Sequence, residues 1–269
     1  MNTSKVFHYG RQIIRNANGI VGLHPDDVWL TSFPRSGNSW IRIIFANIIQ
    51  LSERDGKEVE LWDLPNLVPS LGVSNLLKPW PYQSLPRFVK THHPFRRPFF
   101  AKPRRSILLV RDPRDAILSY YDLAQKSKIV AFRGEFSEFL RHPKYGLSAW
   151  IRHYQSWESM ATVLLKYEEL RKDTVGTLQG AFANLSVDMD RKLIENAIER
   201  SAIDQMRKKE AETGIRDPGR FDANFRAVRT GKTHGWQEAF SDADLQYYQT
   251  IFVDTHGYNY DSMGLMNQA

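Results

Sequence analysis

Residues 31–40 read Thr-Ser-Phe-Pro-Arg-Ser-Gly-Asn-Ser-Trp, and they lie between two apolar runs, Val28–Leu30 and Ile41–Ile49. This pattern predicts a strand, a tight turn that carries a glycine and a cation, and then a helix. Such a turn directs backbone N–H groups and a helix N-terminus toward one point, which is a binding site for anions. A phosphate or a phosphate-like group is expected there. The alternative is an ordinary strand–helix turn with a capping serine.

Four short apolar runs alternate with helical-looking sequence, and this alternation is typical of a parallel sheet. Pro34, Pro94 and Pro113 each follow one of these runs, so loops are expected where the strands end, which is where open α/β sheets bind ligands. The predicted fold class is α/β, with a central parallel sheet flanked by helices and a P-loop-like anion turn. The four predicted strands are Val28–Phe33, Arg87–Thr91, Ser106–Arg111 and Thr162–Tyr167.

The composition is that of an ordinary globular protein: 269 residues, 42% hydrophobic and 25% charged. Lysine and arginine exceed aspartate and glutamate by 37 − 30 = 7, which fits an anionic ligand, a nucleic acid or a membrane surface equally well. The absence of cysteine excludes disulfides and thiolate metal sites. No apolar run approaches the roughly 20 residues that span a bilayer. We therefore expect a soluble intracellular protein, with residues 1–269 as one domain and its core at about 25–260.

Two segments lack clean periodicity. Glu53–Tyr82 is rich in leucine, proline and tryptophan, and we interpret it as irregular structure that lines a pocket. Lys208–Arg229 is charged and contains glycine, and we interpret it as a long loop. Long loops in compact domains are often lids, and a surface excursion is the alternative.

Arg111 ends a predicted strand, and Ser119 follows eight residues later in the next helix. An arginine at such a position can hold a phosphate with its planar fork, and a serine that faces it can add a hydroxyl. A local arginine–aspartate pair is the alternative, and it applies better to Arg114 than to Arg111.

The strand that ends with Lys90-Thr91-His92-His93-Pro94 brings a cation and an imidazole to the same edge of the sheet. A histidine there is well placed to act as a general base, because its ordinary pKa lies near neutrality. A hydrogen-bonded structural histidine is the alternative. Adjacent histidines on an extended strand point to opposite faces, so a metal site is not expected.

The segment Arg229–Trp236 places basic side chains around two glycines, which let backbone N–H groups approach an anion. A basic surface turn is the alternative.

Taken together, these segments resemble the cytosolic sulfotransferase family, whose members take a sulfuryl group from 3′-phosphoadenosine-5′-phosphosulfate (PAPS). The family motifs Y-P-K-S-G-T-T-W, K-T-H-L-P, R-N-P-K-D with S-Y-Y, Y-E-D and R-K-G-x-x-G-D-W occur here in order. The matching segments are Phe33–Trp40, Lys90–Pro94, Arg111–Asp115 with Ser119–Tyr121, Tyr167–Glu169 and Arg229–Trp236. The resemblance extends from residue 28 to about 260.

The resemblance implies a role for each matching residue. Arg35, Lys90 and His92 are the implied catalytic residues, with His92 as the base that takes the proton of the acceptor. No metal is implied. PAPS would be held at the phosphosulfate by Arg35, Ser36, Gly37, Asn38 and Ser39, at the 3′-phosphate by Arg111, Ser119, Arg229, Thr230 and Gly231, and at the adenine by Trp40, Tyr167 and Ser201.

The chain departs from the family pattern at several positions. Arg35 replaces a lysine, and because a guanidinium stays protonated it is a poor proton donor to a leaving group. Asn38 replaces a threonine, Thr230 a lysine, and Ile203 an adenine-stacking phenylalanine. The family's dimer motif is absent from residues 237–246, so dimerisation of that type is not predicted.

The resemblance implies a small-molecule acceptor, no nucleic-acid partner and a cytoplasmic location. The acceptor itself stays open among phenols, alcohols, sugars and amines. Six aromatic residues are candidates for an apolar acceptor pocket: Trp62, Trp80, Tyr82, Phe95, Phe99 and Phe100. Two other functions are weighed, an ATP-dependent phosphotransferase of the P-loop type and a basic nucleic-acid-binding domain. The first lacks the Walker spacing G-x-x-x-x-G-K-[ST], and the second requires a steep salt dependence of binding.

Overall fold

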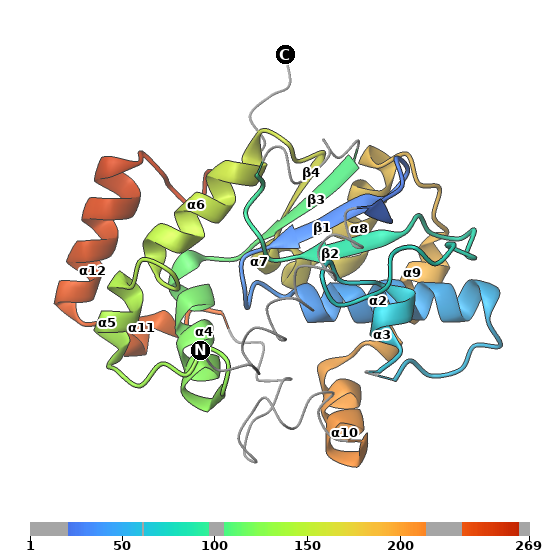
Figure 1. Cartoon of the computed structure of the whole chain (residues 1–269), viewed down its shortest axis with the longest axis horizontal. Helices are drawn as coiled ribbons and strands as arrows, with labels where there is room; N and C mark the ends of the chain where they lie inside the picture. Colours follow the sequence, from blue (N-terminus) through green and yellow to red (C-terminus); the bar gives the residue numbers. More distant parts are fainter. Residues whose placement is uncertain (1–20, 61, 97–104, 214–232, 264–269) are drawn as a thin grey trace, which may run out of the picture.

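A four-stranded parallel sheet forms the centre of the molecule (Figure 1). The computed structural model describes residues 21–60, 62–96, 105–213 and 233–263. Within them the strand order is β2-β1-β3-β4, and each neighbouring pair is parallel. The strands are β1 (Val28–Ser32), β2 (Phe88–Thr91), β3 (Arg105–Val110) and β4 (Val163–Lys166). All four apolar runs are strands, so the predicted α/β class is confirmed.

Successive residues of each strand point to opposite faces of the sheet, and both faces are apolar. Val28 and Leu30 belong to one buried cluster, whereas Trp29 between them belongs to the other. Ile107 of β3 likewise faces the first cluster. This two-sided burial explains why the strands read as nearly continuous apolar runs.

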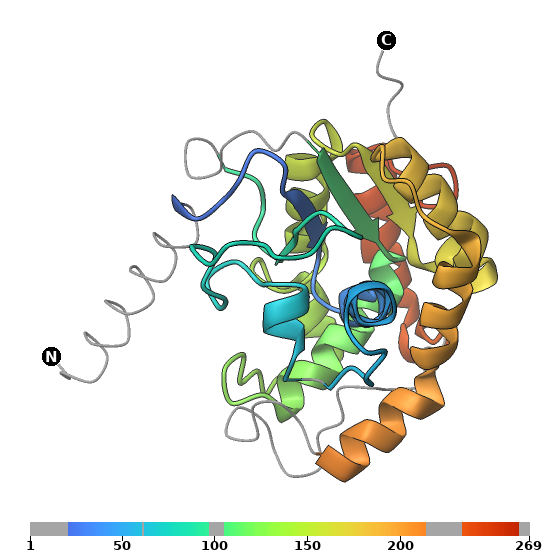
Figure 2. The ribbon, with the colours of Figure 1, turned by 90° about the vertical axis from the view of Figure 1, so that its right-hand side faces the viewer.

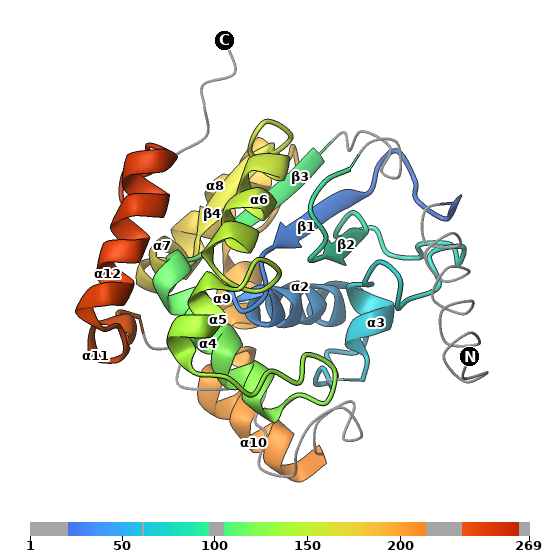
Figure 3. The same ribbon diagram turned by 60° about the vertical axis from the view of Figure 1, so that its left-hand side comes forward.

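Helices cover both faces (Figures 1 and 3). The first cluster is completed by α2 (Asn38–Glu53), α3 (Leu64–Leu67), α7 (Tyr167–Lys172), α8 (Thr174–Asn184) and α9 (Arg191–Arg200). The second is completed by α4 (Pro113–Lys126), α5 (Phe136–Arg141), α6 (Leu147–Glu158), α11 (Trp236–Ala239), α12 (Asp242–Tyr248) and the π-helix η2 (Gln249–Thr255). The layers therefore run helix, sheet, helix.

The carboxyl ends of the four strands meet at one edge of the sheet, because the strands are parallel. Ser32, Thr91, Val110 and Lys166 are their last residues. The residues that follow include the anion turn, His92, Arg111 and Tyr167, so the fold brings the predicted site residues to this one edge.

The segment 53–82 is largely irregular, as predicted. The short helix α3 and a single parallel bridge between Ser70 and Lys90 are its regular features. Whether the segment lines a pocket stays a prediction.

The prediction of a loop across Lys208–Arg229 is wrong for residues 208–213, which end the helix α10 (Ile203–Thr213). The helix Ile203–Thr213 consists mainly of methionine, glutamine, lysine, arginine, glutamate and alanine, which are all strong helix formers. Figure 2 looks nearly along α2 and shows α9 beside it, with α10 continuing from the end of α9 and extending away. Residues 214–229 lie outside the described residues.

Candidate active site

The turn between β1 and α2 has the backbone shape that an anion site needs. Gly37 has a φ of 98° and is the N-cap residue, immediately before the first turn of α2. A Cβ at this position would lie 2.5 Å from Cδ2 of Tyr167, so both the conformation and the space require glycine. Arg35 also has a positive φ, of 69°. Such strain in a non-glycine residue is typical of a functional turn.

The polar groups of the turn fit a bound anion. Ser36 is fully buried, and its Oγ has no hydrogen-bond partner among the described residues. The first-turn amides of a helix have no intrahelical acceptor, so those of Asn38 and Ser39 are available. The amide of Trp40 differs, since it donates to the carbonyl of Gly37 at 3.0 Å. A buried hydroxyl and helix N-terminal amides beside an arginine match a phosphate-like ligand.

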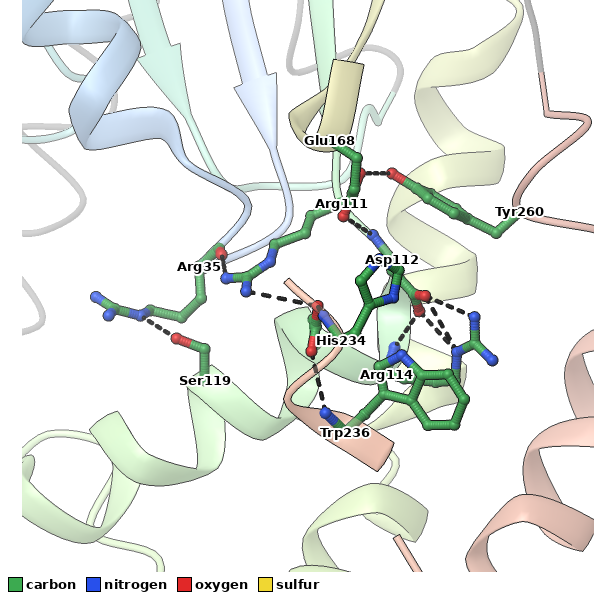
Figure 4. A network of polar contacts seen from close by, with 10 residues as sticks. Arg35, Arg111, Asp112, Arg114, Ser119, Glu168, His234, Trp236 and Tyr260 are labelled. Atoms are coloured by element: carbon green, nitrogen blue, oxygen red, sulfur yellow. Dashed lines mark hydrogen bonds and ion pairs between the residues drawn. The ribbon is translucent and has the colours of Figure 1, made fainter. Parts of the chain in front are cut away.

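Arg35, Arg111 and Ser119 converge on this turn from three different elements (Figure 4). Arg35 donates from Nε to Oγ of Ser119, which lies on α4, at 3.0 Å. Arg111 donates from Nη1 to the carbonyl oxygen of Arg35 at 3.2 Å. Its guanidinium also lies 4.9 Å from the centre of the Tyr167 ring. Arg111 and Ser119, two of the predicted 3′-phosphate residues, therefore lie directly beside the anion turn.

Asp115 connects Arg111 to a segment more than 100 residues later in the chain. Its carboxylate lies 3.8 Å from Nη2 of Arg111 and is 3% exposed. It also accepts hydrogen bonds from the amides of His234, at 2.7 Å, and Trp236, at 3.2 Å. His234 has a φ of 64°, which turns both amides toward the same carboxylate. Asp115 ends the matched motif segment Arg111–Asp115, but the motif assigned no role to it, although its position four residues after Arg111 is a signal for this ion pair.

The ion pair of Arg114 with Asp112 confirms the alternative weighed for Arg114. Its guanidinium bonds both carboxylate oxygens of Asp112 and covers the Trp236 ring at 3.8 Å. Asp112 also donates its amide to Glu168, which accepts from Tyr260 at 2.5 Å (Figure 4). Burial raises the pKa of Glu168. These contacts connect the start of α4 to α7 and α11, so the Arg114 guanidinium has a structural role while Arg111 faces the anion turn.

His92 follows β2 and is oriented by the end of β1. Its Nδ1 lies 2.7 Å from the carbonyl oxygen of Ser32 and 3.3 Å from Oγ of the same serine. A carbonyl only accepts, so Nδ1 carries the proton and Nε2 has the lone pair. Nε2 has no hydrogen-bond partner among the described residues. Burial lowers the pKa of His92 well below its usual value, and the nearby Lys90 adds to this. The imidazole is therefore neutral at pH 7 and can accept a proton.

The loop that carries His92 is held by α6. The indole of Trp157 donates to the carbonyl of His93 at 2.9 Å, and the amide of Phe95 donates to Ser156 at 2.9 Å. His153, one turn earlier, is buried and contacts Oγ1 of Thr31 at 3.3 Å. No sequence pattern points to His153, because its role depends on packing of α6 against the strand ends.

Lys90 precedes His92 by two residues and lies at the edge strand β2. Its amide donates to the carbonyl of Pro69 at 2.8 Å, and its carbonyl accepts from Leu71 at 2.9 Å. Arg42 of α2 supports the same segment through the carbonyls of Leu64 and Val68. The irregular stretch before β2 is thereby fixed next to the lysine and the histidine.

The three predicted adenine residues have different surroundings. The rings of Trp40 and Tyr167 meet edge-on at 6.2 Å, at the border of the anion turn. Ser201 lies deeper, between α9 and α2, where it accepts from Asn47 at 3.0 Å and donates to the carbonyl of Ala197 at 2.6 Å. Its hydrogen is already used, so only an oxygen lone pair is left for an adenine. Arg229, Thr230 and Gly231 lie outside the described residues.

The candidate acceptor-pocket aromatics do not form one group. Trp80 and Tyr82 contact each other at 4.8 Å against the first cluster, whereas Phe95 packs on Trp157 at 5.3 Å in the second. Trp62 is 52% exposed. Phe99 and Phe100 lie outside the described residues.

Two kinds of feature, a cluster of metal ligands and a membrane-spanning helix, are absent from the described residues. No group of three or more histidine, aspartate or glutamate side chains is arranged for a metal ion within the described part of the chain. None of the helices described is at once long enough and apolar enough to cross a membrane.

Comparison with known proteins adds a family and a set of relatives. A family model described as a sulfotransferase domain matches residues 25–264. Mouse sulfotransferase 4A1 is 30% identical over 191 residues, which cover 66% of this chain and 66% of that protein. Mouse sulfotransferase 2A2 is 23% identical over 261 residues, which cover 91% and 90%.

Solved structures agree in fold. Retinol dehydratase in complex with androsterone and the inactive cofactor PAP has a TM-score of 0.69 at 19% identity, over 94% of this chain and 88% of that one. Mouse sulfotransferase SULT7A1 complexed with PAP has a TM-score of 0.65 at 18% identity, over 95% and 96%. At these identities the likeness shows that the fold is shared.

Proposed function

The chain belongs to the sulfotransferase family, and we propose that it moves a sulfuryl group from PAPS to a hydroxyl or amine of a small molecule, with His92 as general base. The membership confirms the family and the enzyme class, a PAPS-dependent sulfotransferase, that the motifs indicate. The observation that carries the proposed mechanism is the orientation of His92: Nδ1 lies 2.7 Å from the Ser32 carbonyl, which leaves Nε2 as the free base.

The donor site is proposed at the turn of residues 35–39. When bound there, PAPS would supply the sulfuryl group and a phosphate leaving group. The buried Ser36 hydroxyl, the first amides of α2 and the Arg35 guanidinium would hold the phosphosulfate. Arg111 and Ser119 would hold the 3′-phosphate, with Arg229, Thr230 and Gly231, and Trp40, Tyr167 and Ser201 would line the adenine. The PAP complexes of two structural relatives support a PAPS donor for this fold, and the residue roles are carried by the sequence motifs.

The chemistry assigned to the protein is proton removal and charge neutralisation. Nε2 of His92 would take the proton of the acceptor as its oxygen or nitrogen forms the new bond to sulfur. Arg35 and Lys90 would counter the negative charge that grows on the leaving oxygen as the old bond breaks. Arg35 would act by charge and donors alone, because its guanidinium stays protonated. Positioning and fixed charges of this kind are the main source of catalysis in related group transfers.

The acceptor is proposed to be a small molecule, and the cytoplasm is the proposed location. Androsterone and retinol occupy complexes of retinol dehydratase, so apolar alcohols are sensible first candidates. No role for nucleic acid or for a family-type dimer is proposed.

The test is a screen of phenols, alcohols and amines with sulfur-labelled PAPS, repeated with His92→Ala and Arg111→Ala. We expect His92→Ala to abolish transfer while PAP binds with near wild-type affinity, because the base touches the acceptor and not the nucleotide. Arg111→Ala should mainly weaken PAP binding. Transfer by His92→Ala at a comparable rate would refute the base, and a tighter affinity for ATP than for PAP would favour a phosphotransferase.

A further inference from the structure

The hydroxyl of Ser32 lies between the catalytic histidine and the anion turn. Its oxygen is 3.3 Å from Nδ1 of His92 and 3.1 Å from Nδ2 of Asn38. Ser32 and Asn38 are buried, at 0% and 5% exposed. Asn38 is the first residue of α2 and follows Gly37 of the turn. The side chains of His92, Ser32 and Asn38 thus form a hydrogen-bonded chain that connects the base to the anion turn.

The donors and acceptors along these three side chains do not match when the Asn38 amide has this orientation. The Ser32 carbonyl fixes the proton on Nδ1 of His92, so the Ser32 oxygen faces two N–H donors, one from His92 and one from Asn38. Its own hydrogen then has no acceptor among the described residues. At the same time Oδ1 of Asn38 is buried without a hydrogen-bond partner in that part of the chain. Each orphaned buried group is destabilising, because it has lost its hydrogen bonds to water without replacement.

A half-turn of the Asn38 amide gives partners to the Ser32 hydrogen and to Oδ1, and it leaves the amide NH₂ as the unsatisfied group. Oδ1 then accepts the hydrogen of Ser32, and the Ser32 lone pair accepts from Nδ1 of His92. The amide NH₂ of Asn38 becomes a donor in search of an acceptor. It belongs to the first residue of α2, directly after Gly37 of the turn, and an anion bound at this helix N-terminus is the matching acceptor.

We propose that Asn38 and Ser32 are positioning residues that form a hydrogen-bond relay, through which an anion held by the turn orders the hydrogen bonds around Nδ1 of His92 and tunes the basicity of Nε2. The relay rests on the proposed function, since it acts through His92. It goes further in giving the loop asparagine and the strand serine a role in proton transfer. Binding and base would thus be coupled directly through hydrogen bonds.

Other charged groups face His92 and stay unchanged in the test. Lys90 belongs to the same strand end, Arg42 to α2 and His153 to α6, and each of them lowers the pKa of His92 together with burial. Acceptors on Nδ1–H have the opposite effect, because they stabilise the imidazolium. Changes confined to the relay therefore shift the pKa in a direction set by the relay alone.

The first variant is Ser32→Ala, which removes one buried oxygen and no carbon. We expect the acid limb of kcat/KM for the acceptor, at saturating PAPS, to move to lower pH, and kcat to fall about tenfold, as for other groups that orient a functional histidine. PAP affinity should stay within about twofold of wild type, because Ser32 does not belong to the anion turn. An unchanged acid limb together with an unchanged kcat overturns the relay.

The second variant is Asn38→Asp, whose carboxylate accepts from Ser32 but repels an anion. We expect the acid limb to move to higher pH and the KM for PAPS to rise. In the double variant Ser32→Ala with Asn38→Asp, measured against Ser32→Ala, the upward shift should shrink to less than half. If the shift is equal with and without the serine hydroxyl, it acts through space and the relay is wrong.

The matched controls are Ser52→Ala, at an exposed position of α2, and Asn196→Asp, at an exposed position of α9. They make the same chemical changes away from the site and should leave the pH profile unchanged. His92→Ala separates this proposal from the proposed function. If His92→Ala keeps full activity the base itself is wrong, whereas a dead His92→Ala with an indifferent Ser32→Ala refutes the relay alone.

Discussion

Arg35 and Ser119 lie 84 residues apart in the sequence, and Nε of the arginine donates to the serine oxygen at 3.0 Å. The hydroxyl therefore holds the Arg35 guanidinium beside the anion turn, and Figure 4 shows its two terminal nitrogens pointing away from Ser119. Arg111 donates to the backbone carbonyl of the same residue, so the main chain at Arg35 is held from the end of β3 and its side chain from α4. A lysine has no Nε–H at this position, so the contact to Ser119 depends on the arginine, whereas the contact to the carbonyl does not.

We expect Arg35→Gln to lower kcat about 10²–10³-fold, as expected for loss of a charged donor that stabilises a developing anion. Arg35→Lys keeps the charge and should retain activity to within about tenfold, although it loses the contact to Ser119. The measurement is steady-state transfer from labelled PAPS. Equal activity of the glutamine and lysine variants would show that charge at residue 35 is not needed.

Lys90 lowers the pKa of His92, with burial as the larger cause. The neutral imidazole is the active base, so kcat/KM should rise with pH along an acid limb whose midpoint lies below 6.5. Lys90→Met removes the nearby positive charge. Because the imidazolium is then less repelled, the midpoint should move to higher pH, even though kcat also falls. Lys128→Met, at an exposed position, is the control. A midpoint that stays fixed or moves downward contradicts the electrostatic link.

Asp115 should matter for nucleotide binding although it is placed to touch no nucleotide. Its carboxylate holds the amides of His234 and Trp236 and faces Arg111. A hydrogen bond to a charged acceptor contributes about 1.5–3 kcal/mol, so Asp115→Asn should raise the Kd for PAP by roughly tenfold or more. Calorimetric titration measures this directly. Asp204→Asn makes the same charge change at an exposed position and should bind PAP as the wild type does.

The strands and the main site residues were predictable because both follow from local sequence. Val28–Phe33 and Ser106–Arg111 are apolar on both faces, and a strand buried on both sides has that composition. His92 and Arg111 directly follow strands, so parallel topology alone brings them together. The segment 208–213 was misread, because a charged stretch of helix formers near a glycine resembles a loop when its period is not weighed.

Contacts between distant segments were not predictable. Nothing in residues 35 and 119 announces their hydrogen bond, and the contacts of Asp115 with residues 234 and 236 form only when that segment folds back onto α4. The Asn38–Ser32–His92 chain also requires coordinates, because its meaning depends on which atoms have donors and acceptors. Such contacts depend on tertiary packing, which single-sequence periodicity does not record.

His153 makes the stability of the fold depend on pH. Burial lowers its pKa to about 3, whereas a histidine in the unfolded chain has its ordinary value near 6.5. Between these values the unfolded state binds a proton that the folded state rejects. The stabilising contribution is therefore complete above pH 6.5 and is lost as the pH falls toward 3.

We expect the free energy of unfolding to fall by up to about 1.4 kcal/mol per pH unit from this residue alone. His153→Gln keeps a polar group for Thr31 but cannot take up the proton, so its stability should depend less on pH over this range. Urea unfolding of both proteins at pH 7, 6 and 5 gives the two slopes. Carboxylates and the other histidines contribute equally to both, so the difference between the slopes belongs to His153. Parallel slopes would show that the pKa of His153 in the folded protein is not lowered by burial.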